Sequence, residues 1–181
     1  MNQIKSYLFI FLISFGVAGE IQYQPILLSG LITNPKQEIS GMDLYNDQIM
    51  LLPENLGGFL YMISKDEILN ALEKKDRIPI EPKQPAFHTP DYSKSIRGFE
   101  GLEAIAFNGN NVYITLESKD DETMRGYLAW GTIDPTTKEV TIPNKNLLEL
   151  ETPIQVNNMT FESLLIHNDH VILFYETQGI N

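Results

Sequence analysis

One short segment occurs three times along this chain, and this repeat constrains the fold more than any other feature. The copies are residues 40–55 (SGMDLYNDQIMLLPEN), 103–118 (EAIAFNGNNVYITLES) and 162–177 (ESLLIHNDHVILFYET), and they align without a gap. The copies start 63 and then 59 residues apart. A recurring unit of this kind is one supersecondary element that buries its apolar face against neighbouring copies.

Each copy predicts a β-hairpin. Its centre holds residues that supply tight turns, namely Asn46-Asp47, Gly109-Asn110 and Asn168-Asp169. Apolar runs rich in Ile, Val, Leu and aromatic residues lie on both sides of each turn. These runs are too continuously apolar for a sheet with one wet face. We therefore expect sheets buried between neighbouring sheets, as in a propeller or a sandwich.

Further strands follow the first two hairpins. Residues 58–64 predict a third strand for the first unit, and residues 126–133 and 139–142 predict third and fourth strands for the second. Four strands in about sixty residues match a propeller blade. The expected fold is all-β, a β-propeller-like array with two full four-stranded blades and part of a third, which forms an incomplete ring.

Two insertions interrupt the repeat. Residues 64–67 (SKDE) form a capping box, which predicts a short helix that ends near Lys75. Residues 78–98 contain four prolines and predict an irregular connection. Such a connection is either a plain surface crossover or a cover over a site.

The N-terminus predicts export. Residues 1–18 have one early lysine, a twelve-residue apolar run and small residues at the exit, as in a secretory signal peptide. The run is short for a membrane span; an uncleaved anchor and a buried segment are the alternatives. We expect a mature domain over residues 19–181, secreted or periplasmic, with no stable membrane span after cleavage.

Composition excludes several classes of function. A formal charge of −11 argues against nucleic acid as a partner, because like charges repel. The acidity serves either solubility or the binding of a hard cation such as Ca²⁺. The chain has no cysteine, which excludes disulfides and thiol chemistry. Its three histidines are scattered, and His167 and His170 flank a predicted turn.

The strings FEGLEAIAF (residues 99–107), VYITLES (112–118) and ISGMDLYNDQIMLLPEN (39–55) resemble the secreted β-propellers of the "esterase-like activity of phytase" family. The resemblance spans about residues 38–177. It implies a multi-bladed propeller, metal binding, and esterase or phosphatase activity on a small-molecule ester or phosphoester. A closed propeller with blades of this size needs roughly 300 residues. The chain is therefore expected to be a fragment, a truncated product, or a half-propeller that needs missing blades or self-association.

Glutamates occupy the ends of the repeated segments. By symmetry about the turn, we expect Glu103 opposite Glu117, Glu162 opposite Glu176, and Ser40 opposite Glu54, all near one mouth of the array. Like charges in such pairs need compensation. Bound Ca²⁺ would supply it; the alternatives are a raised pKa that keeps one carboxyl neutral, or hydrogen bonds to backbone N–H groups. The predicted metal ligands are Glu103, Glu117, Glu162, Glu176 and Glu54.

No catalytic nucleophile can be assigned from the sequence. There is no Gly-x-Ser-x-Gly elbow and no serine–histidine pair at a recognisable spacing. Two functions remain as hypotheses. One is the N-terminal part of a secreted phytase-like or esterase-like protein, a metal-dependent hydrolase. The other is a non-catalytic extracellular module that binds a partner or serves as structure.

Overall fold

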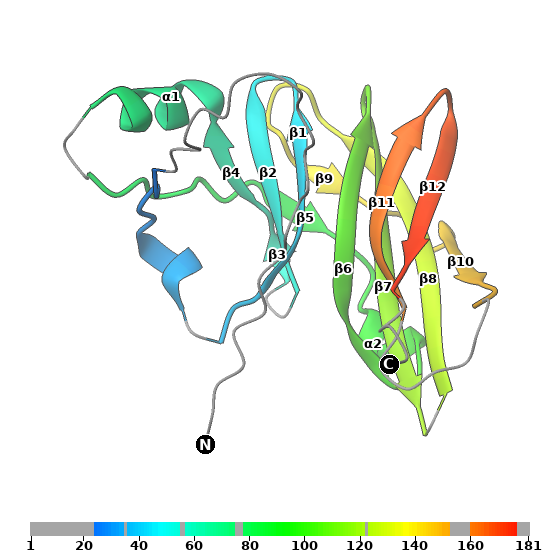
Figure 1. Ribbon diagram of the computed structural model, residues 1–181. Coiled ribbons are helices and arrows are strands. Elements are labelled where there is room, and N and C mark those ends of the chain that lie inside the picture. Colours follow the sequence, from blue (N-terminus) through cyan, green and yellow to red (C-terminus); the bar gives the residue numbers. More distant parts are fainter. Residues whose placement is uncertain are drawn as a thin grey trace, which may run out of the picture.

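The computed structural model describes residues 24–34, 36–54, 57–74, 78–121, 123–152 and 160–176. The predicted signal peptide, residues 1–18, lies outside the described residues. The described chain is predominantly β, as the repeat predicts (Figure 1). Its elements are η1 (Gly30–Thr33), β1 (Ile39–Tyr45), β2 (Gln48–Pro53), β3 (Gly58–Phe59), β4 (Tyr61–Ser64), α1 (Lys65–Glu73), β5 (Ala86–His88), α2 (Tyr92–Ser95), β6 (Phe99–Asn108), β7 (Asn111–Asp120), β8 (Thr123–Ile133), β9 (Val140–Thr141), β10 (Leu147–Leu150), β11 (Phe161–His167) and β12 (His170–Tyr175).

The strands form three sheets of unequal size. The first has the order β1-β2-β4, the second β3-β5-β9-β8-β7-β6 with β10 paired to β8, and the third is the β11-β12 hairpin. The described strands therefore do not divide into regular four-stranded blades. The reason is local: the predicted strand at residues 58–64 splits at Leu60. Its first part pairs with β5 and its second part with β2, while β5 also pairs in parallel with β9.

The three predicted hairpins are present as β1–β2, β6–β7 and β11–β12, all antiparallel. Their turns use backbone conformations with positive φ at Asn46, Gly109, Asn168 and Asp169, which Asn, Asp and Gly tolerate. Figure 1 shows the hairpins side by side, and β6 contacts both β1 and β11. The first strands of the three hairpins thus lie next to one another.

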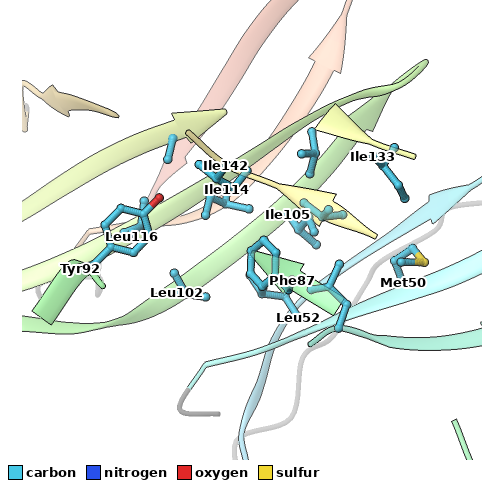
Figure 2. Packing of buried hydrophobic residues seen from close by; sticks show 14 of the residues in the cluster. Met50, Leu52, Phe87, Tyr92, Leu102, Ile105, Ile114, Leu116, Ile133 and Ile142 are labelled. Atoms are coloured by element: carbon cyan, nitrogen blue, oxygen red, sulfur yellow. The ribbon is translucent and has the colours of Figure 1, made fainter. Parts of the chain in front are cut away.

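The main core lies between the first and second sheets. Met50 and Leu52 from β2 share one buried cluster with Ile105 from β6 and Ile114 from β7. In Figure 2, Phe87 lies between Leu52 and Ile105, and Ile114 lies beside Ile142. Each such side chain contributes roughly 1.5–3 kcal/mol when fully buried.

The connection at residues 78–98 joins this core. Besides Phe87 of β5, it contributes Tyr92 and Ile96, each only 4% exposed. Of the two alternatives for this connection, a plain surface crossover does not describe it, because part of it is buried in the core. Its prolines limit β5 to three residues, but the apolar residues between the prolines still pack inward.

The predicted capping box is confirmed at the start of α1. Ser64 Oγ accepts from the Glu67 backbone N–H at 3.2 Å, and Glu67 Oε2 accepts from the Ser64 backbone N–H at 2.9 Å. Ile68 packs on a second cluster formed by Leu51, Tyr61 and Ile63. No helix in the described part of the chain is long and apolar enough to cross a membrane.

Candidate functional site

Each hairpin carries a one-residue β-bulge at the same position of the repeat. The ladder skips Ser40 in β1, Glu103 in β6 and Glu162 in β11, the first residue of each repeated segment. A bulge leaves one residue unpaired, bends the strand and re-aims the side chain. The repeat therefore encodes a distortion as well as a hairpin.

The bulges change which residues face each other. Glu117 lies opposite Gly101, so the predicted direct pairing of Glu103 with Glu117 is wrong. The two-residue turn moves the hairpin centre by half a residue, and the bulge removes Glu103 from the ladder. The other two predicted pairs, Ser40–Glu54 and Glu162–Glu176, are wrong for the same reason: the Glu54 N–H donates to Glu38 O at 3.0 Å, and the Glu176 N–H donates to Thr160 O at 2.9 Å.

The glutamates meet instead between consecutive hairpins. Glu54, the residue after β2, extends over Gly101 of β6. A Cβ on Gly101 would lie 3.1 Å from Glu54 Oε1 and 3.2 Å from Glu103 Oε1, and only 2.7 Å from Glu54 Cγ. Because Gly101 has no side chain, the carboxylates of Glu54 and Glu103 both fit beside it.

The same step recurs between the second and third hairpins. Thr160 occupies the repeat position of Gly101 and is fully buried. Its hydroxyl donates to Glu117 Oε2 at 2.9 Å and lies 3.4 Å from Glu162 Oε1. One hydroxyl has one proton to donate, so it satisfies only one of the two carboxylates at a time.

Glu103 is the most constrained member of the group. It is 7% exposed, and its Oε1 atom is buried without a hydrogen-bond partner in the described residues. Burial, and then the charges of Glu117, Glu162 and Glu54 in that order of importance, together raise the pKa of Glu103 to about 8. Glu103 is therefore largely protonated at neutral pH.

The other glutamates are perturbed in the same direction. Burial, then the hydrogen bond and charge of Glu38, raise the pKa of Glu54 to about 7. Burial also raises the pKa of Glu117, although the hydrogen bond from Thr160 opposes this. The pKa of Glu162 is raised first by partial loss of hydration and then by the charges of Glu117 and Glu176.

Four of the five predicted site residues are thus brought together, and we call Glu54, Glu103, Glu117 and Glu162 the glutamate cluster. Glu176 is exposed and takes part only through its charge, which raises the pKa values of Glu117 and Glu162. The ion pairs within the described ranges involve Asp91, Asp120 and Glu149, and none involves the cluster.

The donor set of the cluster suits a hard cation. It consists of carboxylate oxygens and the Thr160 hydroxyl, which are ligands that Ca²⁺ accepts. The unpartnered Glu103 Oε1 and the space over Gly101 provide a ligand atom and room beside it. Within the residues that the structure describes, however, no three Asp, Glu, His or Cys side chains lie close enough to hold one ion as they stand. Binding therefore requires rotation of these side chains.

A cavity of about 350 Å³ borders the cluster at Glu54. Its polar lining includes Thr89, Asp91 and Ser93, and its apolar lining includes Leu102. The connection at residues 78–98 supplies one wall, so this segment covers a cavity beside the cluster. A larger cavity, about 530 Å³, lies along residues 123–125 and 149–152, where Arg125 and Glu149 are already paired at 2.5 Å.

Sequence reasoning missed Gly101 and Thr160, although both stand two residues before a bulge and so share one repeat position.

The histidines are exposed, and His167 and His170 lie at the β11–β12 turn as predicted. Within the part of the chain that the structure describes, buried hydroxyls without a hydrogen-bond partner occur at Tyr92, Thr115 and Ser118.

Comparison with protein-family models found no match, and a search of curated proteins found none either. The resemblance to the phytase-like propellers remains a prediction from the short hairpin motifs.

Proposed function

We propose that this chain is an exported β-propeller arc that binds Ca²⁺ at the glutamate cluster and holds a small ester or phosphoester in the adjoining cavity. The observation that carries the proposal is the buried Glu103 carboxyl, whose Oε1 lacks a partner while three other glutamates surround it. Such a group keeps a proton or takes a cation.

The propeller part of the proposal rests on the repeat and its packing. The first strands β1, β6 and β11 lie side by side, and each begins a hairpin that leads away from them. Blades that radiate from adjacent inner strands have this arrangement. The joining of β5 and β3 to the second sheet is the departure from a regular blade.

A cation also explains how an acidic cavity accepts an anionic substrate. Glu54 and Asp91 line the cavity, and the whole chain is acidic. A phosphoester would be repelled unless a bound divalent cation reversed the local charge. When bound, Ca²⁺ would polarise the phosphoryl or carbonyl oxygen. Glu54 and Glu103 would hold the ion, and a neighbouring glutamate would accept a proton from water.

Calcium titration followed by calorimetry and by thermal unfolding tests the proposal. At a hundredfold excess over Kd, binding to the folded state adds about 2.7 kcal/mol, or about 5–10 °C in Tm for a domain of this size. Glu103→Gln should remove most of the shift, whereas Glu73→Gln on the exposed surface of α1 should leave it intact. Absence of a shift in the wild-type protein contradicts the proposal.

Activity then separates the two functions. Hydrolysis of p-nitrophenyl acetate and p-nitrophenyl phosphate should be measured with Ca²⁺ and with EDTA. Calcium-dependent hydrolysis of the phosphoester supports the hydrolase. Calcium binding without hydrolysis of either substrate assigns the chain to the non-catalytic binding modules instead.

A further inference from the structure

The hairpins pack on one another by one repeated step. β1 and β2 of the first hairpin contact β6, the first strand of the second; β6 and β7 then contact β11, the first strand of the third. In each step, both strands of the earlier hairpin contact the first strand of the next hairpin.

The residues at the first step define the two faces involved. Asp43 of β1 accepts a hydrogen bond from the Phe107 N–H of β6 at 2.7 Å. Beside it, a Cβ on Gly41 would lie 2.9 Å from Ile105 N. We call the face of a hairpin that contacts the next hairpin, marked here by Asp43, its forward face. We call the face that contacts the preceding hairpin, marked here by Ile105 and Phe107, its backward face.

On the third hairpin, the forward face carries exposed apolar side chains, and none of the described strands packs over it. Leu165 stands at the repeat position of Asp43, and it lies opposite Ile172 in the hairpin ladder. Leu165, Ile172 and Phe174 are 51%, 39% and 51% exposed. The corresponding positions on β2, Met50 and Leu52, are fully buried against the second hairpin.

On the first hairpin, the β1 part of the backward face is exposed among the residues that the structure describes. Met42 and Leu44 of β1 stand at the repeat positions of Ile105 and Phe107, and they are 68% and 54% exposed. On β2, Leu51 lies opposite Met42 in the ladder, and Ile32 and Ile80 pack against the cluster that contains Leu51. The cover lies over β2, whereas Met42 and Leu44 lie on β1, the first strand of the hairpin. In both observed steps, the first strand of a hairpin contacts both strands of the preceding hairpin.

We propose that two copies of this chain associate head to tail, with β1 of each copy docked on the β11–β12 face of the other. The proposal uses the packing step that the chain already makes twice, and it does not depend on the cation site. Contacts between two different faces of a protein build either a closed ring or an open filament. Two reciprocal contacts between two copies join six hairpins into a ring, which leaves neither apolar face exposed.

Sedimentation and light scattering at micromolar concentrations test the proposal. The wild-type chain should have twice its monomer mass. Leu44→Asp and Leu165→Asp should each be monomeric, since each breaks both reciprocal contacts. An equimolar mixture of the two variants should regain a dimer, because the intact β1 of one fits the intact β11–β12 face of the other. Leu148→Asp on β10, where the leucine is 53% exposed, is the matched control and should stay dimeric.

Cysteine cross-linking gives a second readout that does not depend on loss of association. The chain has no cysteine, and the repeat places residue 165 of one copy against residue 44 of the other, as Asp43 lies against Phe107. A mixture of Leu44→Cys and Leu165→Cys chains should form a disulfide dimer on mild oxidation, whereas either variant alone should not. A monomeric wild-type chain, a mass that grows with concentration beyond twice the monomer mass, or cross-links within one variant would each overturn the two-copy ring.

Discussion

Replacing Glu103 by Gln should stabilise the protein at neutral pH in the absence of calcium. The substitution keeps the shape of the side chain and removes its charge. Glu103 lies among Glu54, Glu117 and Glu162 with little access to water. A neutral amide avoids the cost of ionising a buried carboxyl, and its NH₂ group can donate to Glu117.

The magnitude follows from the shifted pKa. The pKa of Glu103 rises from 4.5 to about 8, so the unfolded chain releases this proton at lower pH than the folded chain does. Below pH 4.5 both states are protonated, and the substitution is close to neutral. Above it, the wild-type protein loses stability by about 1.4 kcal/mol per pH unit until the folded carboxyl ionises near pH 8. The upper bound at pH 7 is about 3 kcal/mol; because the cluster shares its protons, we expect a gain of about 1–3 kcal/mol.

Urea unfolding of both proteins in EDTA, at half-unit steps from pH 4.5 to 8.5, measures this difference. The free energy of unfolding of Glu103→Gln minus that of the wild type should grow with pH and level off near pH 8. Glu73→Gln, the same change on the exposed surface of α1, should show no such growth. A destabilised Glu103→Gln protein at pH 7, or a difference that does not change with pH, would refute the reasoning.

Three further substitutions test separate parts of the structure by urea unfolding. Thr160→Val removes the 2.9 Å hydrogen bond to Glu117 and should cost about 1–3 kcal/mol at neutral pH. Because burial raises the pKa of Glu117, the cost should become smaller as the pH falls and this acceptor loses its charge; a cost that does not change with pH would argue against the charged acceptor. Gly41→Ala places a Cβ 2.9 Å from Ile105 N and should lower the free energy of unfolding by about 1–3 kcal/mol. An unchanged free energy of unfolding would contradict the close approach of β1 and β6. Ser64→Ala removes the cap of α1 and should cost about 1 kcal/mol, with retained stability as the contrary result.

The hairpins could be predicted because their signal is local. The pair Asn168-Asp169 between two apolar runs indicates a hairpin turn, because both residues tolerate the positive φ that such a turn requires. Both adopt a positive φ in the structure. The capping box of α1 was predictable for the same reason. The division into blades was not, because the pairing of β3 with β5 depends on a long connection whose path no local pattern specifies.

The site was predicted in composition but not in geometry. The repeat identified Glu54, Glu103, Glu117 and Glu162, which the structure gathers. The predicted ladder pairs failed because a bulge at Glu103 moves every residue beyond it by one position. The bulges lie at the same repeat position in all three hairpins. Knowledge of one bulge would therefore have been enough to predict the other two. The approach of Glu54 to Gly101 depends on the packing of two hairpins, which sequence spacing does not show.

The most direct test of the glutamate cluster is a carbon-13 NMR titration of the glutamate side-chain carboxyls in EDTA and again in saturating Ca²⁺. In EDTA, Glu54 and Glu103 should titrate near pH 7 and 8, well above the ordinary glutamate value of 4.5. Calcium should lower both midpoints by at least about one unit, because the cation favours the ionised form. Midpoints near 4.5 for both residues in EDTA, or midpoints that Ca²⁺ leaves unchanged, would contradict the account.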